Sequence, residues 1–244
     1  MVGRPEAGDR VARMGHRPSS AQRRSLLVPA LASTLAVVSP VPGVASEIPL
    51  DIGRLERVGV EVSAVEYRGR AAVRVVEAAG PEGAQTLAIV SGTSFRNGTI
   101  ELDVAGSPRE GAFGGARGFV GVAFRAQRSP LRYECFYLRP TNGRADDQLR
   151  RNHSTQYVSE PGHPWHRLRK ESPGVYESYV DLVPGEWTKV KVVVSGTDAR
   201  LYVHGADQPC LVVTDLKLGD SEGAIALWIG TGTEAHFANL RVTP

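Results

Sequence analysis

From Leu55 to the C-terminus, hydrophobic and polar residues alternate with a period of two in a series of short segments. These segments are rich in Val, Ile, Tyr and Phe, and most end at Gly, Pro, Asn or Asp, which is typical of strands separated by turns. They are residues 71–78, 86–90, 98–106, 119–127, 132–140, 154–160, 187–196, 199–205, 209–216 and 224–230. We find no amphipathic helix and no internal repeat, so the pattern predicts an all-β antiparallel sandwich or barrel.

Side chains alternate across a sheet, so parity within each segment assigns residues to faces. The residues predicted to face the core are Ile100, Leu102, Val104, Val120, Val122, Phe124, Phe136, Leu138, Ile225, Leu227 and Ile229. The same parity places Gly121, Ala123, Arg125, Cys135, Tyr137, Arg139, Ala224, Ala226 and Trp228 on the opposite face. Glu134 falls on the core side, against the preference of a carboxylate.

The outer face therefore combines small residues such as Gly121 with large flat or hydrogen-bonding ones such as Tyr137, Arg139 and Trp228. We interpret it as a shallow platform with room for a ligand above it. A solvated face with scattered aromatic residues is the other interpretation, because antiparallel sheets commonly expose one face.

Two long connections interrupt the strands. Residues 107–118 are rich in glycine, but no helix follows them, so they do not resemble a phosphate-binding loop. Residues 159–187 contain four prolines together with Trp165, Tyr176 and Tyr179. A connection of this length inside a compact domain is usually functional.

Charge and hydropathy separate the first 46 residues from the rest. The chain has 244 residues and a formal charge of +3, but six arginines against two acids give residues 1–24 a net charge of +4 and leave about −1 for residues 47–244. The apolar run from Ser25 to Val38 is short and contains Pro29, and small residues follow it. We expect residues 1–46 to be a signal peptide that is removed near Ala45 or Ser46.

A leader of this kind predicts that the protein is exported and that the mature chain begins after it. Arg23-Arg24 before Ser25-Leu26-Leu27 resembles a twin-arginine signal, and a plain secretory leader also carries such pairs, so both routes stay open. We expect residues 47–244 to form one secreted or periplasmic domain with no membrane span. Because its net charge is slightly negative, nucleic acid is not an expected partner.

The chain has only two cysteines, Cys135 and Cys210. An oxidising compartment would permit a bridge between them. Two cysteines do not make a disulfide framework, so we favour two separate, small apolar residues on different strands.

Several segments together resemble a known family. In order they are GTIELDVAG, FVGVAFR, YECFYLRP, QYVSEPGHPWHRLRKESPGVYE, EWTKVKVVVSG, ARLYVHG and AIALWIGTGTEAHFANLRV. They look like the bacterial concanavalin A-like (laminin G-like) jelly-roll family that is grouped with 3-keto-disaccharide hydrolases and domains of unknown function. The resemblance covers roughly residues 58–242. It implies a two-sheet jelly roll with one concave sheet that holds a carbohydrate, and it leaves binder and enzyme open.

An enzyme of this fold needs paired carboxylates. Jelly-roll glucanases carry an E-x-D-x-x-E strand motif, and here the nearest match is Glu101, Asp103 and then Gly106 in place of the second Glu. The general acid is therefore missing. Alternating acids are also what a half-exposed strand shows.

Metal sites have little support in the sequence. His163 and His166 have a ligand-like spacing, but Pro164 prevents a helix that would align both imidazoles. We expect no cofactor. Laminin G-like folds hold calcium on loop carbonyls and aspartates, a role open to Asp146, Asp147 and Asp215, although no calcium-loop spacing is present.

A recognition site remains, because sugars stack on flat rings and hydrogen-bond to guanidinium and amide groups. The residues predicted to bind the ligand are Arg125, Glu134, Tyr137, Arg139, Gln156, Tyr157, Trp165 and Trp228. We expect a carbohydrate-binding sandwich. The second hypothesis is a hydrolase of the 3-keto-disaccharide type that uses Glu134, Glu101 or a histidine of residues 153–166, and the third is a laminin G-like protein-interaction module.

Overall fold

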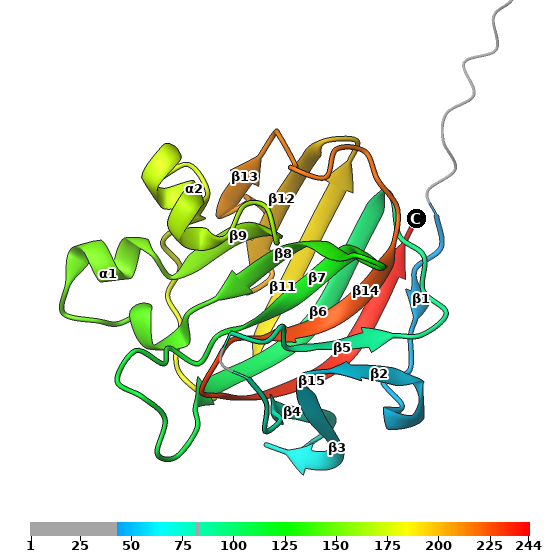
Figure 1. Cartoon of the computed structure of the whole chain (residues 1–244), viewed down its shortest axis with the longest axis horizontal. Coiled ribbons are helices and arrows are strands. Elements are labelled where there is room, and N and C mark those ends of the chain that lie inside the picture. Colours follow the sequence, from blue (N-terminus) through cyan, green and yellow to red (C-terminus); the bar gives the residue numbers. More distant parts are fainter. Residues whose placement is uncertain (1–42, 82) are drawn as a thin grey trace, which may run out of the picture. The chain divides into compact units, whose positions relative to one another are not determined.

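The structure is a computed structural model that describes residues 43–81 and 83–244, so the predicted leader lies almost entirely outside the described residues. The described chain forms two antiparallel sheets that pack face to face (Figure 1). The predicted all-β jelly-roll sandwich is thereby confirmed. No helix in the described part of the chain has the length and apolar character needed to cross a bilayer.

The eight-stranded sheet has the order β13-β12-β11-β6-β15-β4-β3, with β1 paired to β15. Its strands are β1 (Ser46–Glu47), β3 (Val60–Tyr67), β4 (Arg70–Glu77), β6 (Gly98–Pro108), β11 (Thr188–Ser195), β12 (Asp198–Val203), β13 (Leu211–Val213) and β15 (Thr233–Thr243).

The seven-stranded sheet has the order β10-β9-β8-β7-β14-β5-β2. Its strands are β2 (Leu55–Val58), β5 (Leu87–Val90), β7 (Val120–Arg128), β8 (Leu131–Leu138), β9 (Thr155–Glu160), β10 (Glu177–Ser178) and β14 (Ala224–Ile229). The remaining elements are the 3-10 turns η1 (Ile52–Arg54) and η2 (Pro140–Asn142) and the helices α1 (Gln148–Asn152) and α2 (Trp165–Glu171).

The ten strands that the period-two pattern predicts are all present, whereas two short helices are not predicted. Both helices lie at the end of the sandwich beside β8 and β9 (Figure 1). The side chain of Asp147 caps α1 by accepting the Arg150 N–H at 2.7 Å. Pro164 is the N-cap of α2, so the proline starts the helix and leaves His163 outside it. At five and seven residues they are too short to show a periodic apolar face.

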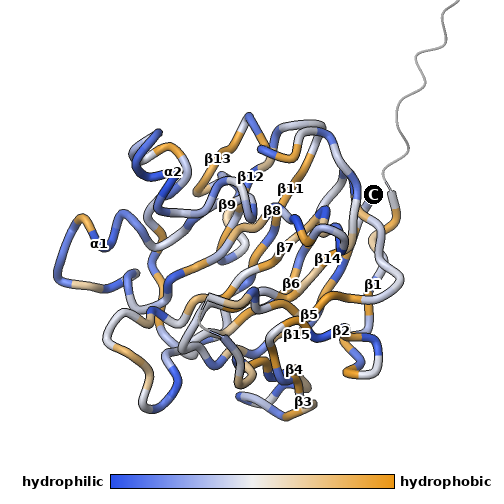
Figure 2. Tube along the Cα trace, in the orientation of Figure 1, coloured by the Kyte–Doolittle hydropathy of each residue, from blue (hydrophilic) through white to orange (hydrophobic). Residues whose placement is uncertain are grey.

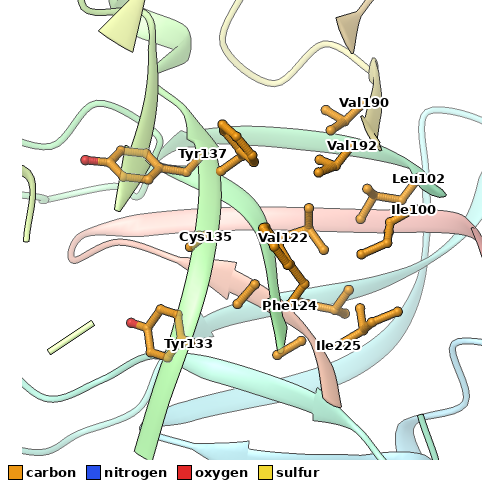
Figure 3. Packing of buried hydrophobic residues seen from close by; sticks show 14 of the residues in the cluster. Ile100, Leu102, Val122, Phe124, Tyr133, Cys135, Tyr137, Val190, Val192 and Ile225 are labelled. Atoms are coloured by element: carbon orange, nitrogen blue, oxygen red, sulfur yellow. The ribbon is translucent and has the colours of Figure 1, made fainter. Parts of the chain in front are cut away.

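The parity assignment of the core is confirmed. The predicted inward residues of β6, β7, β8 and β14 are buried between the sheets. In Figure 3, Val122 and Phe124 face Ile100 and Leu102, whereas the ring of Tyr137 lies on the other side of β8. Apolar residues mark the central strands, and polar residues dominate α1 and its flanking loops (Figure 2).

Neither cysteine is bridged. Cys135 is buried on the outer face of β8, and Cys210 lies just before β13 in the other sheet. The interpretation of two separate small residues is thus confirmed for the structure described here. Burial raises the pKa of the Cys135 thiol well above its ordinary value, so this thiol is not nucleophilic at neutral pH.

Candidate functional site

Strand register brings five residues into one line on the outer face of the seven-stranded sheet. Gln156 pairs with Glu177 on one side and with Tyr137 on the other, Tyr137 pairs with Gly121, and Gly121 pairs with Trp228. Residues directly opposite each other in neighbouring strands point to the same face. We call Glu177, Gln156, Tyr137, Gly121 and Trp228 the central row.

Gly121 lets the two largest rings of the central row meet. The ring centroids of Tyr137 and Trp228 are 4.6 Å apart, although a whole strand separates β8 from β14. A Cβ atom at Gly121 would lie 2.6 Å from the Cα and Cβ atoms of Tyr137. The room that the sequence predicts above the small residues is therefore filled by Tyr137 and Trp228.

Arg139 organises the polar side of the central row. Its Nη2 donates to the Tyr137 hydroxyl at 2.8 Å and to Oε1 of Gln156 at 3.1 Å, and its Nη1 donates to the His153 carbonyl at 3.0 Å. Gln156 in turn donates from Nε2 to the Tyr176 carbonyl at 3.0 Å. Burial raises the pKa of Tyr137 to about 12, so the hydroxyl stays protonated at neutral pH.

Glu177 ends the central row as a buried carboxylate. Arg169 of α2 binds it through two nitrogens at 2.7 and 2.9 Å, and Nε2 of His153 lies 3.3 Å away. Burial lowers the pKa of His153, and the charges of Arg169 and Arg139 lower it further against the opposing charge of Glu177. His153 is therefore a neutral imidazole at neutral pH.

Solvent reaches both tryptophans of this site. Trp228 is half-buried at one end of the central row, and its Nε1 donates to the Tyr133 hydroxyl at 3.2 Å. Trp165 opens α2 with 44% of its surface exposed, and the Arg169 guanidinium lies 4.8 Å above its ring. Of the predicted ligand residues, the structure thus groups Tyr137, Arg139, Gln156 and Trp228, and connects Trp165 to them through Arg169 and Glu177.

The predicted position of Arg125 is wrong. A β-bulge between Phe124 and Gln127, with a φ of 52° at Arg125, interrupts the alternation and turns the side chain away from the outer face. The guanidinium is 0% exposed and donates to the carbonyls of Arg96, Gly196 and Gly219 at 2.6–2.9 Å. Arg125 therefore joins three loops at the far end of β7 and does not lie beside Tyr137.

Glu134 and Tyr157 also lie on the wrong face for the predicted site. Phe136 pairs with Tyr157, so both face the core, and Gln156 and Tyr157 are neighbours that point to opposite sides. Oε2 of Glu134 accepts the Tyr157 hydroxyl at 2.5 Å, and Oε1 accepts the Leu218 N–H at 2.7 Å. Both side chains thus secure the loop before β14 from inside the sandwich.

The carboxylates that a hydrolase would need do not come together. Glu134 is 0% exposed between the sheets, whereas Glu101 lies on the eight-stranded sheet near Lys189 at 3.5 Å. For calcium, Asp147 caps α1 and Asp215 accepts the Tyr176 hydroxyl at 2.7 Å. Across residues 43–81 and 83–244, no three His, Cys, Asp or Glu side chains gather as metal ligands.

Glu134 gives the fold a pH dependence whose sign follows from its burial. Desolvation raises the pKa of Glu134 above its ordinary value of 4.5, against the hydrogen bonds from Tyr157 and Leu218. The folded state then holds this proton more tightly than the unfolded state. The stabilisation of the folded state by the protonated Glu134 is therefore complete below pH 4.5 and is lost as pH rises through the folded pKa. We expect the stability advantage of the wild type over Glu134→Gln to shrink from pH 4 upward in urea unfolding.

Glu171→Gln is the matched control, because the stability that Glu171 contributes should change with pH in the opposite direction. Arg167 lowers the pKa of the exposed Glu171, so this carboxylate contributes stability above its unfolded pKa and loses it as pH falls. The difference between wild type and Glu171→Gln therefore grows with pH. A wild-type advantage over Glu134→Gln that also grew with pH would contradict the assignment of Glu134.

The fold places this chain in a known structural class. No known family model matches the sequence, and none of the curated proteins is detectably similar to it. The carbohydrate binding module CBM66 from Bacillus subtilis has a TM-score of 0.51 and 13% identity, over 77% of this chain and 93% of that one. A protein of unknown function with a galectin-like fold, also from B. subtilis, has a TM-score of 0.50 and 12% identity over 78% and 88%. The fold is therefore an all-β, two-sheet jelly roll like that of these two proteins.

Proposed function

We propose that this protein is an exported carbohydrate-binding β-sandwich that binds a saccharide on the outer face of its seven-stranded sheet, over the central row. The observation that carries the proposal is the contact between Tyr137 and Trp228 beside the hydrogen-bonded Arg139 and Gln156. A flat ring that solvent reaches and that a buried hydrogen-bonded network supports is suited to stacking on the apolar C–H face of a sugar.

Within this proposal the residues have different tasks. Trp228 and Trp165, which solvent reaches, supply the stacking surfaces. The buried Tyr137 packs against Trp228, and Arg139, itself bonded to Gln156, holds the Tyr137 hydroxyl in place. The fold shared with the carbohydrate binding module CBM66 supports the proposal. Export is supported by the Arg-rich, then apolar, then small-residue order of residues 1–46.

Glycan titration by calorimetry tests the proposal. Trp228→Ala is expected to weaken binding about tenfold or more, because truncation of a central aromatic anchor commonly costs upwards of 1.4 kcal/mol. Trp165→Ala is expected to weaken binding less, since its ring is already covered on one side by Arg169.

Trp187→Ala is the matched control. Trp187 precedes β11 of the other sheet, where it packs against Tyr67 and Arg70, and we expect glycan affinity to be unchanged. Equal affinity of wild type and Trp228→Ala for every glycan that binds, or the absence of binding to any glycan of an array, would remove the proposed site.

A further inference from the structure

Three arginines meet at the η2 turn, beside the central row. Arg139 immediately precedes this turn, and the carbonyl of Arg117 accepts the Thr141 N–H at 3.2 Å. Arg150 of α1 donates to Thr141 Oγ1 at 3.1 Å and to Asn142 Oδ1 at 2.9 Å. The Arg139 and Asn142 side chains both donate to the His153 carbonyl, at 3.0 and 3.1 Å, so Asn142 lies between the guanidinium groups of Arg139 and Arg150. The main chain of Arg117 reaches the same turn, and we call Arg117, Arg139 and Arg150 the arginine cluster.

The arginine cluster carries more positive charge than its surroundings neutralise. Arg117 donates only to the carbonyls of Gly114 and Ala116, and no ion pair of Arg117 or Arg150 exists within the described residues. The nearest carboxylate oxygen of Arg139 is 3.9 Å away on Glu177, which Arg169 already binds in bidentate fashion. Burial, followed by repulsion from Arg150 and Arg139, lowers the pKa of Arg117.

Aromatic rings border the arginine cluster. Phe119 follows Arg117 by two residues, and its ring lies 6.1 Å from that of Tyr137, which in turn contacts Trp228. The Arg139 guanidinium lies 4.9 Å from the Tyr137 ring centroid. Unneutralised guanidinium groups beside stacking rings are suited to a sugar that carries an anion, because guanidinium binds carboxylate and sulfate in a bidentate manner.

We infer that the saccharide bound at this site carries a carboxylate or a sulfate ester, and that the partly exposed Arg117 and Arg150 of the arginine cluster bind this anionic group, while the buried Arg139 adds its charge from beneath; the inference rests on the proposed function. A small, local excess of positive charge on a domain of net charge about −1 favours a single anionic substituent over the extended phosphate backbone of a nucleic acid.

The test compares three tetrasaccharide probes on the wild-type protein: a tetragalacturonide, its neutral methyl ester, and a heparin-derived sulfated tetrasaccharide. We expect one of the acidic probes to bind at least about tenfold more tightly than the methyl ester, because a hydrogen bond to a charged partner is among the stronger ones. Added salt should weaken the binding of the acidic probe and leave the binding of the ester unchanged. The acidic probe that binds more tightly identifies the anionic group.

Variants then locate the interaction. Arg117→Gln and Arg150→Gln are each expected to weaken binding of the acidic probe about tenfold, with little effect on binding of the ester. Arg144→Gln removes an equal charge from the loop between η2 and α1, but Nε and Nη2 of Arg144 already bind Asp181 at 2.8 Å, so this variant should bind the probes like the wild type.

The outcomes separate this inference from the proposed function. If the methyl ester binds as tightly as both acidic probes and salt has no effect, the inference is overturned while carbohydrate binding stands. If no probe and no other glycan binds, both the inference and the proposed carbohydrate binding are overturned. The wild-type comparison decides the matter even if Arg150→Gln fails to fold.

Discussion

Replacing Arg125 with alanine is expected to destabilise the folded protein by about 3–5 kcal/mol, the range for removing one partner from a buried, hydrogen-bonded charge network. The guanidinium donates to the carbonyls of Arg96, Gly196 and Gly219, which belong to three different loops. Alanine would leave these oxygens without donors and would open a cavity where a fully buried side chain now lies.

Thermal and urea unfolding measure this loss, and a fall in melting temperature of roughly 10 °C is expected for a domain of this size. Arg125→Lys keeps the charge but not the planar set of donors, so it should recover only part of the stability. Arg128→Ala is the control. It is three residues away on the same strand, and its ion pair with Glu56 is about half exposed at both ends, so the expected change is under about 0.5 kcal/mol. Equal stability of the two alanine variants would contradict the role assigned to Arg125.

Replacing Gly121 with alanine is the second change with a large expected effect. The added Cβ would meet the backbone carbonyl of Phe136 and the Cα and Cβ atoms of Tyr137, the latter two at 2.6 Å. Backbone atoms in the middle of a paired strand cannot move aside easily, so β7 and β8 must separate locally. We expect a cost of about 3 kcal/mol, at the upper end of typical overpacking penalties.

This substitution should also disturb the candidate site, because Gly121 lies between Tyr137 and Trp228 in the central row. Near-ultraviolet circular dichroism reports on that ring contact and should change even under conditions in which the variant stays folded. Gly114→Ala is the control, since a Cβ there has nothing within 4 Å. An unaltered aromatic spectrum together with wild-type stability for Gly121→Ala would mean that the close approach at this glycine does not matter.

The alternation of polar and apolar residues predicts most of the sandwich because it reflects burial directly. Leu102, Val122 and Leu227 are core residues in the structure as the pattern predicts. The pattern fails at Arg125, since a bulge inserts a residue without any change in composition. At Glu134 the pattern correctly places a carboxylate on the core side, but it does not reveal the partners from β9 and from the loop before β14 that satisfy it.

The candidate site is only partly predictable for a related reason. Tyr137, Arg139 and Trp228 are assigned to the correct face from parity alone. Which strand lies beside which is a property of the whole sheet, so the sequence does not show that Glu177 pairs with Gln156. His153 and Arg169 enter the site only through α1, α2 and the turns beside them, whose short spans carry no periodic signal.

The bonds of Arg125 have a consequence for how the chain tolerates change. Three of its five acceptors, including all those within 3.0 Å, are main-chain oxygens, which every amino acid supplies. The contacts of Arg125 with Arg96, Gly196 and Gly219 therefore depend on where each carbonyl lies and not on the side chain at that position. The three loops at that end of the domain are suited to accepting inserted peptides, because the buried guanidinium of Arg125 holds all three of them.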